Sequence, residues 1–386
     1  MNFVAIRMLV GDRAKYVGIV VGLTFASLLI TQQMSIFVGL MMRTYGAITD
    51  LGAPDLWVMD EKVQFIDDVK PLQSTQLYRV RGVEGVDWAV PLYKGLLKAR
   101  LSNGSFQTVN VLGLDDATLI GGPPEMVEGR LEDLRRAEGV IVDEVGAQTK
   151  LARPSDVPGG SPTPLVVGDT LELNDHRAVV VGICRVTRTF QSQPVVYTTF
   201  SRATTYAPRE RKLLSFVLVG IEPGAPAGPV CERIRAATGL AAYTADEFRW
   251  MTMQYFMKYT GIPINFGIAV LLGFLVGTAI AGQTFYNFTI ENLKQFGALK
   301  AMGLGNARLL GMILLQALLV GSIGWGIGVG FASLFGWATR GSELAFRMTW
   351  WILVISAGAV AVICSLSALI SIRKVFKLEP AIVFKS

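Results

Sequence analysis

The chain has 386 residues, of which 51% are hydrophobic and only 17% are charged, and its formal net charge is +6. A mean hydropathy of +0.44 is too apolar for an ordinary soluble protein, so the sequence predicts membrane segments. The basic residues cluster beside the apolar runs and are not interleaved with aromatic side chains. They therefore indicate anchoring in a membrane and exclude nucleic-acid binding as the main function.

The first long apolar run covers residues 16–39 and contains no charged side chain. As a helix it would be about 36 Å long, which exceeds the thickness of a bilayer core, about 30 Å. The alternative is a cleaved signal peptide, because Arg7, Arg13 and Lys15 lie in the preceding residues 1–15. The run is longer than a usual signal sequence and no small-residue cleavage site follows it, so we interpret it as a membrane span.

Three further uncharged runs are each long enough to cross a membrane. They cover residues 264–288, 309–338 and 348–372. With four spans, both termini lie on the same side. Lysine and arginine are enriched before the first span, in the loop 289–308 and in the tail 373–386, so the positive-inside rule places these segments in the cytoplasm. Residues 40–263 and the short loop 339–347 are then expected to face the outside.

The composition of the spans bears on mechanism. No ionisable residue lies at the centre of any predicted span, which disfavours a proton-coupled or ion-coupled carrier, since such carriers bind the coupling ion there. The spans are rich in small residues, which let helix backbones approach closely. The predicted packing positions are Gly273, Gly277, Gly321, Gly324 and Gly328. This packing joins either two protomers or the helices of one protomer, and the pattern leaves both open.

Residues 40–263 have the composition of a water-soluble domain and are long enough to bury a core. Short apolar runs alternate with Gly, Pro, Asn and Asp, a pattern that predicts an α+β fold. Val109 and Val111 are spaced for one face of a strand. Further strands are predicted at residues 165–167, 178–183, 195–199 and 216–220. The proline-rich segment 153–164 is predicted to be an exposed loop or a joint between subdomains.

A helix is predicted just before the second span. Thr244 and Glu247 have the spacing of a capping box, and aromatic side chains from Phe248 onward recur at helical spacing. The helix is expected to break near Gly261 and Pro263. It either extends the second span outward as a lever or packs on the surface of the domain, and the pattern does not decide between the two.

The sequence shows no constellation of catalytic residues. The single histidine, His176, has no clustered partner, and the acidic pairs 67–68 and 115–116 are expected to be solvated turn residues. The three cysteines lack metal-ligand spacing, and Cys184 and Cys231 are expected to be buried free thiols and not a disulfide. No phosphate-binding P-loop motif occurs, so a partner must bind any ATP. We therefore expect no catalytic, metal or cofactor site in this chain.

The loop after the second span carries the most specific pattern. Residues 289–303 read TIENLKQFGALKAMG and resemble the cytoplasmic loop of the MacB/FtsX superfamily of ABC permeases, in which an acidic residue precedes an FG-x-LKA-x-G pattern. The order of one span, a large domain, three spans and a short basic tail is similar as well. Segments 55–58, 273–277 and 283–286 resemble the DevC branch most.

The resemblance implies a fold and a set of partners. The fold would be an α-helical membrane protein with four transmembrane helices and an α+β periplasmic core domain inserted between the first and second spans. The location would be the bacterial inner membrane. The partners would be a second permease copy, two copies of a cytoplasmic ABC ATPase that bind ATP and Mg, a periplasmic adaptor protein and an outer-membrane channel.

The resemblance also assigns the loop to ATPase coupling. Charged and apolar side chains are mixed there, which is typical of a short helix at the membrane surface that presents a face to a partner. The residues expected to couple to the ATPase are Glu291, Asn292, Leu293, Lys294, Gln295, Phe296, Gly297, Lys300, Met302 and Gly303. The implied function is the permease subunit of an ABC exporter. Two alternatives stay open: a mechanical regulator of a periplasmic cell-wall hydrolase, as FtsX relatives are, and a membrane-anchored sensor or enzyme.

Overall fold

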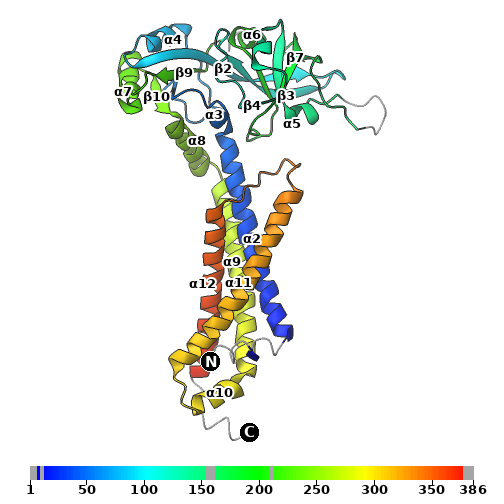
Figure 1. Cartoon of the computed structure of the whole chain (residues 1–386), viewed down its shortest axis with the longest axis vertical. Coiled ribbons are helices and arrows are strands. Elements are labelled where there is room, and N and C mark those ends of the chain that lie inside the picture. The colour runs from blue at the N-terminus through cyan, green and yellow to red at the C-terminus, as the bar shows by residue number, and fades with distance from the viewer. Residues whose placement is uncertain (1–6, 9–12, 154–160, 209–212, 377–386) are drawn as a thin grey trace. The chain divides into compact units, whose positions relative to one another are not determined.

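The computed structural model divides the chain into two compact units. One unit is formed by Met1–Leu40 and Gly261–Ser386, and the other by Met41–Thr260 (Figure 1). The structure describes residues 7–8, 13–153, 161–208 and 213–376. The predictions for most of segment 1–15, for the middle of the loop 153–164 and for the last ten residues of the tail fall outside this range.

Four long apolar helices in the described residues confirm the predicted four-span fold. They are α2 (Arg13–Thr44), α9 (Ile262–Glu291), α11 (Asn306–Ala338) and α12 (Trp350–Phe376). The bounds differ by a few residues from the predicted spans. Residues 289–291 belong to α9 and not to the loop, because backbone hydrogen bonds extend the helix beyond its apolar run until Asn292.

All five predicted packing glycines lie against another helix of the same chain. A Cβ added at Gly277 would lie 2.4 Å from the Cβ of Ala26 on α2. The corresponding contacts are made to α2 by Gly273, Gly324 and Gly328, and to α12 by Gly321. Of the two alternatives that the sequence leaves open, the structure thus shows packing within one protomer, where the absent side chains let α9 and α11 approach α2 closely.

The second unit is built on a mixed sheet of ten strands among the described residues, which confirms the predicted α+β fold. The strand order is β10-β1-β9-β2-β3-β8-β5-β7-β4, and β6 pairs with β2 and β7. The strands are β1 (Leu56–Met59), β2 (Val86–Arg100), β3 (Phe106–Leu114), β4 (Glu125–Glu128), β5 (Gly139–Asp143), β6 (Thr170–Leu173), β7 (His176–Arg185), β8 (Val195–Thr199), β9 (Phe216–Ile221) and β10 (Ala241–Thr244).

Short helices cover this sheet. They are α3 (Gly46–Asp50), α4 (Ser74–Arg81), η1 (Leu131–Arg135), α5 (Glu144–Gln148), α6 (Phe200–Tyr206), α7 (Ala227–Thr238) and α8 (Ala245–Tyr259). Figure 1 shows α4 and α7 near β9 and β10, and α5 and α6 near β3 and β7 at the other side of the unit.

Alternate residues of β1 enter two separate hydrophobic cores. Leu56 and Val58 belong to a core that includes side chains of α4 and α7, whereas Trp57 and Met59 belong to a core that includes Phe248 of α8. Successive side chains of a strand point to opposite faces, so β1 is covered on both sides. A strand buried on both faces carries no polar alternation, which is why the sequence pattern does not reveal it.

The strand β2 joins the two halves of the sheet. Its first part pairs with β9 from Val86 to Leu92, and its second part pairs with β3 from Tyr93 to Arg100. β6 pairs with β2 only at Ala99 and Arg100. One long strand therefore has different neighbours along its length, and between its pairings with β9 and with β6 lie Tyr93 to Lys98.

The predicted capping box at the start of α8 is confirmed. The main-chain N–H of Glu247 donates to Thr244 Oγ1 at 3.2 Å, and the N–H of Thr244 donates to Glu247 Oε2 at 2.9 Å. Phe248 is fully buried, and its ring centroid lies 5.5 Å from that of Trp57. α8 therefore packs on its own domain, the second of the two alternatives, and it is separate from α9, as the predicted break requires.

One predicted strand is wrong. Residues 165–167 form no strand: the N–H of Leu165 donates to the carbonyl oxygen of Ala147 at 2.9 Å, and the chain then turns. The Asp169 carboxylate stabilises this turn by accepting from the N–H of Val166 at 2.9 Å. The local apolar run favours a strand, but the side chain of Asp169 competes for its main-chain groups.

The acidic pairs lie at turns, as predicted, with Asp67 and Asp116 exposed, and their carboxylates also accept hydrogen bonds or form ion pairs. Asp115 accepts hydrogen bonds from the N–H and hydroxyl of Thr118, each at 2.9 Å. Asp116 accepts from the hydroxyl of Ser201 at 3.0 Å. Asp67 forms an ion pair with the buried Lys94. These carboxylates hold turns and loops in place, which a local pattern does not show when the partners are distant in sequence.

Asp143 is buried at the start of α5. Its carboxylate accepts from the main-chain N–H groups of Gly146 at 2.8 Å and Val195 at 2.6 Å. Burial nevertheless raises the pKa of Asp143 above its usual value, because desolvation outweighs these bonds. Burial likewise raises the pKa of the Cys184 thiol, and the nearby Asp143 carboxylate adds to this shift. Cys184 and Cys231 are free and buried in different hydrophobic cores, as the sequence predicts.

Candidate coupling site between the second and third spans

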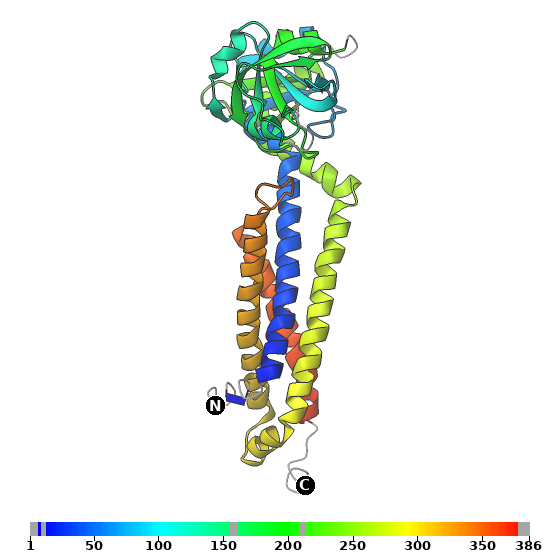
Figure 2. The same cartoon turned by 90° about the vertical axis from the view of Figure 1, so that its right-hand side faces the viewer.

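A short helix, α10 (Leu293–Ala301), connects α9 to α11 at one end of the helical unit (Figures 1 and 2). Asn292 forms the joint. Its N–H and its side-chain Nδ2 both donate to the carbonyl oxygen of Phe288, at 3.2 and 2.8 Å, and so close the last turn of α9. Its own carbonyl oxygen accepts from the N–H of Phe296 at 3.1 Å and so opens α10. One residue therefore ends one helix and begins the next.

One face of α10 is buried against the bundle. Phe296 is fully buried and belongs to a core with Leu309 and Ile313 of α11 and Ile372 of α12. Gly297 beside it is buried too. Burying a phenylalanine side chain contributes roughly 1.5–3 kcal/mol. Phe296 therefore anchors α10 to the helices on which it lies.

The opposite face of α10 is exposed. Lys294, Gln295 and Ala298 are less buried than Phe296, and Met302, just after the helix, is 71% exposed. An exposed methionine at the end of a helix held by a buried phenylalanine is an apolar contact point that the chain itself leaves uncovered. The arrangement can bind a partner surface.

Gly303 follows the end of α10. It adopts φ 93°, in the left-handed region, and its N–H donates to the carbonyl oxygen of Lys300 at 3.0 Å. The N–H of Leu304 donates to the carbonyl oxygen of Leu299 at 3.1 Å. These two bonds form a Schellman motif, which satisfies the last carbonyl groups of the helix. Gly305 then caps the start of α11, so the chain reverses between two glycines.

An ion pair joins the first and second spans beside this joint. The ammonium group of Lys15, in the first turn of α2, pairs with the carboxylate of Glu291, the last residue of α9. The sequence pattern predicts that Glu291 contacts the ATPase and does not single out Lys15 as its partner. The only signal in the sequence is a pair of opposite charges at the expected cytoplasmic ends of two spans.

The structure divides the ten predicted coupling residues into two groups. Phe296 and Gly297 are buried, so they position the helix and are not exposed to a partner. The remaining eight are exposed or half-buried: Glu291, Asn292, Leu293, Lys294, Gln295, Lys300, Met302 and Gly303. Ala298 and Arg308 are exposed on the same segment but were not predicted, because a single sequence marks charge and pattern and not exposure.

No group of three or more histidine, cysteine, aspartate or glutamate side chains among the described residues is arranged to hold a metal ion. His176 is exposed on β7, and its ring lies 5.8 Å from that of Tyr206.

Comparison with known proteins now identifies the family. The model of the FtsX-like permease C-terminal region matches residues 249–380, and the model of the MacB-like periplasmic core domain matches residues 17–237. The fold and these two matches define a polytopic membrane protein of the ABC permease class, with a periplasmic core domain. The chain belongs to the MacB/FtsX family of ABC transporter permeases.

Solved structures similar to this chain are extracytoplasmic domains. The extracellular domain of the noncanonic ABC-type transporter YknZ from Gram-positive bacteria is 13% identical, with a TM-score of 0.35, and the match covers 50% of this chain and 98% of that chain. The periplasmic region of MacB from Actinobacillus actinomycetemcomitans is 14% identical, with a TM-score of 0.36, and the match covers 53% of this chain and 96% of that chain.

Proposed function

We propose that this chain is the permease subunit of an ABC exporter and that α10 receives the force of a separate cytoplasmic ATPase. The observation that carries the proposal is the division of α10 into two faces. Met302 stands exposed at one side, whereas Phe296 is fully buried on the other. A helix that is exposed to a partner on one side and anchored to the bundle on the other passes a displacement by the partner on to the bundle.

The contacts of Phe296 suggest where such a push goes. Phe296 belongs to one buried core with Leu309 of α11 and Ile372 of α12, so we infer that a displacement of α10 reaches both helices through this core. The ion pair of Glu291 with Lys15 adds α2, the helix that leads into the extracytoplasmic domain. Densely packed interiors transmit displacement because they have little free volume.

We further propose that the loop, both termini and the basic tail lie in the cytoplasm of a bacterial cell, with residues 41–260 in the periplasm. Lysine and arginine near the loop and the chain ends support this orientation through the positive-inside rule. The finer placement in the DevC branch stays a prediction.

The proposed assembly contains two permease copies and two ATPase copies, with ATP and Mg bound by the ATPase and no cofactor in this chain. The apolar side chains Ile268, Leu271 and Leu275 of α9 are all exposed in the single chain. This surface of α9 is therefore available to a second copy or to lipid. A periplasmic adaptor protein and an outer-membrane channel complete the proposed export route.

The test is the affinity of the full chain, in nanodiscs, for its cognate ATPase. The variant Met302→Glu places a charge on the exposed face, and Met257→Glu is a matched control, since Met257 is 44% exposed on α8. Because a central interface residue contributes more than about 1 kcal/mol, we expect about tenfold weaker binding for Met302→Glu. The control should bind normally and keep its stimulation of ATP hydrolysis.

Equal ATPase affinity of both variants and the wild type would remove α10 from the coupling role. Export is tested separately, by following substrate accumulation in cells that carry Met302→Glu. If export is unchanged while a periplasmic cell-wall hydrolase loses its activation, the regulator function replaces the exporter function.

A further inference from the structure

The extracytoplasmic domain contains a cavity that the proposed coupling role does not use. Its volume is about 510 Å³, which lies within the range of ligand pockets. Apolar walls are supplied by Val69, Leu96 and Phe190, and polar groups by Lys94 and Asn110. The cavity lies where β2 changes its neighbour from β9 to β6.

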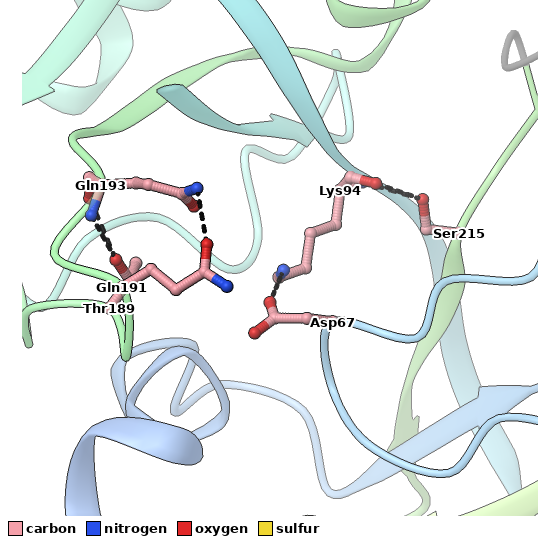
Figure 3. Close-up of polar contacts among 6 residues, drawn as sticks. All are labelled: Asp67, Lys94, Thr189, Gln191, Gln193 and Ser215. Atoms are coloured by element: carbon pink, nitrogen blue, oxygen red, sulfur yellow. Dashed lines mark hydrogen bonds and ion pairs between the residues drawn. The ribbon is translucent and has the colours of Figure 1, made fainter. Parts of the chain in front are cut away.

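A buried lysine forms part of this cavity (Figure 3). The side chain of Lys94 is only 3% exposed, and its ammonium group pairs with the carboxylate of Asp67, which is 46% exposed. The main-chain N–H of Lys94 donates to Ser215 Oγ at 2.8 Å, and that hydroxyl donates back to the carbonyl oxygen of Lys94 at 3.1 Å. The charges of Lys94 and Asp67 balance, so the lining has no net charge.

Amide side chains stand across the opening from this ion pair. Gln193 donates from Nε2 to Gln191 Oε1 at 3.0 Å, and the N–H of Gln193 donates to Thr189 Oγ1 at 2.8 Å. Figure 3 shows the Gln191 amide on one side of the opening and the Lys94–Asp67 pair on the other. A neutral lining rich in amides suits a ligand whose polar groups are themselves uncharged donors and acceptors.

Asn110 supplies an acceptor that the described residues leave unused. The residue is 3% exposed, it lines the cavity, and its Oδ1 has no hydrogen-bond partner among the described residues. Buried polar atoms nearly always have a partner, so an unpartnered acceptor facing a cavity points to a donor that enters from outside.

The edge of β2 offers a second unused pair of groups. On this edge the carbonyl oxygen of Leu92 accepts from the N–H of Ser215, and the main chain of Lys94 is bridged by the same serine. Four residues further on, Lys98 bonds with Asn174, whose N–H donates to the carbonyl oxygen of Lys98 at 2.9 Å. Leu92, Lys94 and Lys98, which alternate along the strand, therefore direct main-chain polar groups away from β3.

Leu96 lies between Lys94 and Lys98 and, by the alternation of an antiparallel ladder, points its N–H and carbonyl oxygen to the same edge. Its opposite residue on β3, Asn110, directs its own N–H to Pro194 and not to Leu96. No strand pairs with this edge of β2 at Leu96 in the described residues, and Leu96 is 47% exposed in the cavity wall.

We propose that this cavity binds an extended peptide segment, which pairs its main chain with the N–H and carbonyl oxygen of Leu96 and donates a hydrogen bond to Asn110 Oδ1. Addition of a strand to an open edge is a known mode of peptide binding. Main-chain pairing explains why a neutral lining suffices, and the apolar walls at Val69 and Phe190 accept the side chains of the peptide. The inference does not depend on ATPase coupling.

The test selects a random heptapeptide library, displayed on phage, against the full chain in nanodiscs. The Asn110→Leu chain serves as the counter-target. The enriched sequence is then synthesised with capped ends, together with two analogues that are N-methylated at alternate amides, one analogue for each strand register. We expect saturable binding of the unmethylated peptide, and about tenfold weaker binding of one N-methylated analogue, since it loses a main-chain donor.

Two variants at one position separate main-chain pairing from side-chain packing. Leu96→Pro removes an N–H that does not bond to β3 and should weaken binding about tenfold, whereas Leu96→Val keeps the N–H and should bind normally. Hydrogen exchange of the Leu96 amide in the wild type needs no variant and should slow when the peptide is bound.

The proposal fails if no sequence is enriched on the wild type over Asn110→Leu. It also fails if both N-methylated analogues bind as tightly as the parent peptide, or if the Leu96 amide exchanges equally fast in the saturated complex. ATP hydrolysis plays no part in these measurements, so their failure leaves the coupling role unaffected, and failure of the coupling role leaves them unaffected.

Discussion

Lys15 at the start of α2 forms an ion pair with Glu291 at the end of α9. Glu291 directly precedes Asn292, the joint from which α10 begins, so the pair holds the point at which the coupling helix leaves the bundle. Both side chains retain some exposure, and a pair of this kind contributes about 1 kcal/mol or less to stability. The ion pair therefore fixes the point where α10 begins and contributes little to stability.

Reversing one charge of this pair should uncouple the chain without unfolding it. We expect Glu291→Lys to lower ATPase stimulation several-fold while the free energy of unfolding changes by less than about 1 kcal/mol. The double variant Lys15→Glu, Glu291→Lys should recover most of the stimulation, because it restores an opposite pair. A double variant as inactive as the single one would show that Glu291 acts directly on the partner and not through Lys15.

Truncating the anchor of α10 should loosen the helix. Phe296→Ala removes a fully buried ring, and we expect a loss of about 3–5 kcal/mol in the stability of the helical unit. Phe296→Leu fills most of the volume and should lose less. Hydrogen exchange of the α10 amides is the measurement, and unchanged exchange in Phe296→Ala would contradict the anchoring role.

The turn after α10 requires glycine at one of its two positions. Gly303 has φ 93°, so Gly303→Ala should destabilise the turn by about 1 kcal/mol, although no atom lies within 4 Å of the added Cβ. Gly305 has equal space but φ −70°, so Gly305→Ala is the matched control and should be tolerated. Thermal unfolding of both purified variants gives the comparison, and equal midpoints would contradict the role of the left-handed φ.

Packing of the spans gives another pair of matched variants. A Cβ at Gly277 would lie 2.4 Å from that of Ala26, so Gly277→Ala should cost about 1–3 kcal/mol by overpacking. Gly326 has no atom within 4 Å of its Cβ position, and Gly326→Ala should be neutral or slightly stabilising, because alanine favours helices. The temperature at which each purified variant aggregates in detergent distinguishes the two. A tolerated Gly277→Ala would mean that α2 and α9 are not in close contact.

The contribution of two buried carboxyl groups, Asp50 and Asp143, to the stability of the extracytoplasmic domain should fall as the pH rises above 3.8. Burial raises the pKa of Asp143 and of Asp50 in the folded state above 3.8, the usual value of the unfolded chain. The folded state therefore binds more protons between the two pKa values, so this contribution is highest below 3.8 and falls as the pH passes through the raised pKa.

Asp143→Asn should flatten this dependence, because the amide does not ionise. It should also destabilise the domain at neutral pH, since an amide nitrogen cannot accept the bond from Gly146 or Val195 that one carboxylate oxygen accepts. Urea unfolding followed by tryptophan fluorescence at several pH values measures both effects. An equally steep pH dependence in Asp143→Asn would assign the effect to other groups.

The membrane helices could be predicted because long uncharged runs are rare outside membrane spans, whereas the strands depend on partners that are distant in sequence. β2 contains Pro91, Lys94 and Gly95, residues that argue against a central strand when only the neighbouring residues are considered. Lys94 is tolerated there because Asp67 and Ser215 satisfy it. The residues next to Lys94 in the sequence do not indicate these two partners, so neither β2 nor the cavity beside it could be predicted.

The coupling loop could be located from its residue pattern, but the division of its residues could not. Phe296 and Met302 are both apolar members of one short segment, yet one is fully buried and the other is 71% exposed. Helical spacing alone leaves open which face meets the bundle. The Schellman turn at Gly303 and the packing of Phe296 on α11 decide it.

The most direct test places a photoreactive amino acid at position 302 of the full chain and, as a control, at the exposed position 257. Purified complexes are illuminated in the presence of ATP, and the cross-linked products are identified by mass spectrometry. The coupling role of α10 predicts a cross-link from position 302 to an ATP-hydrolysing subunit and none from position 257. Labelling of a Met302→Cys variant by a membrane-impermeant thiol reagent added outside intact cells, together with no cross-link from position 302 to such a subunit, would contradict it.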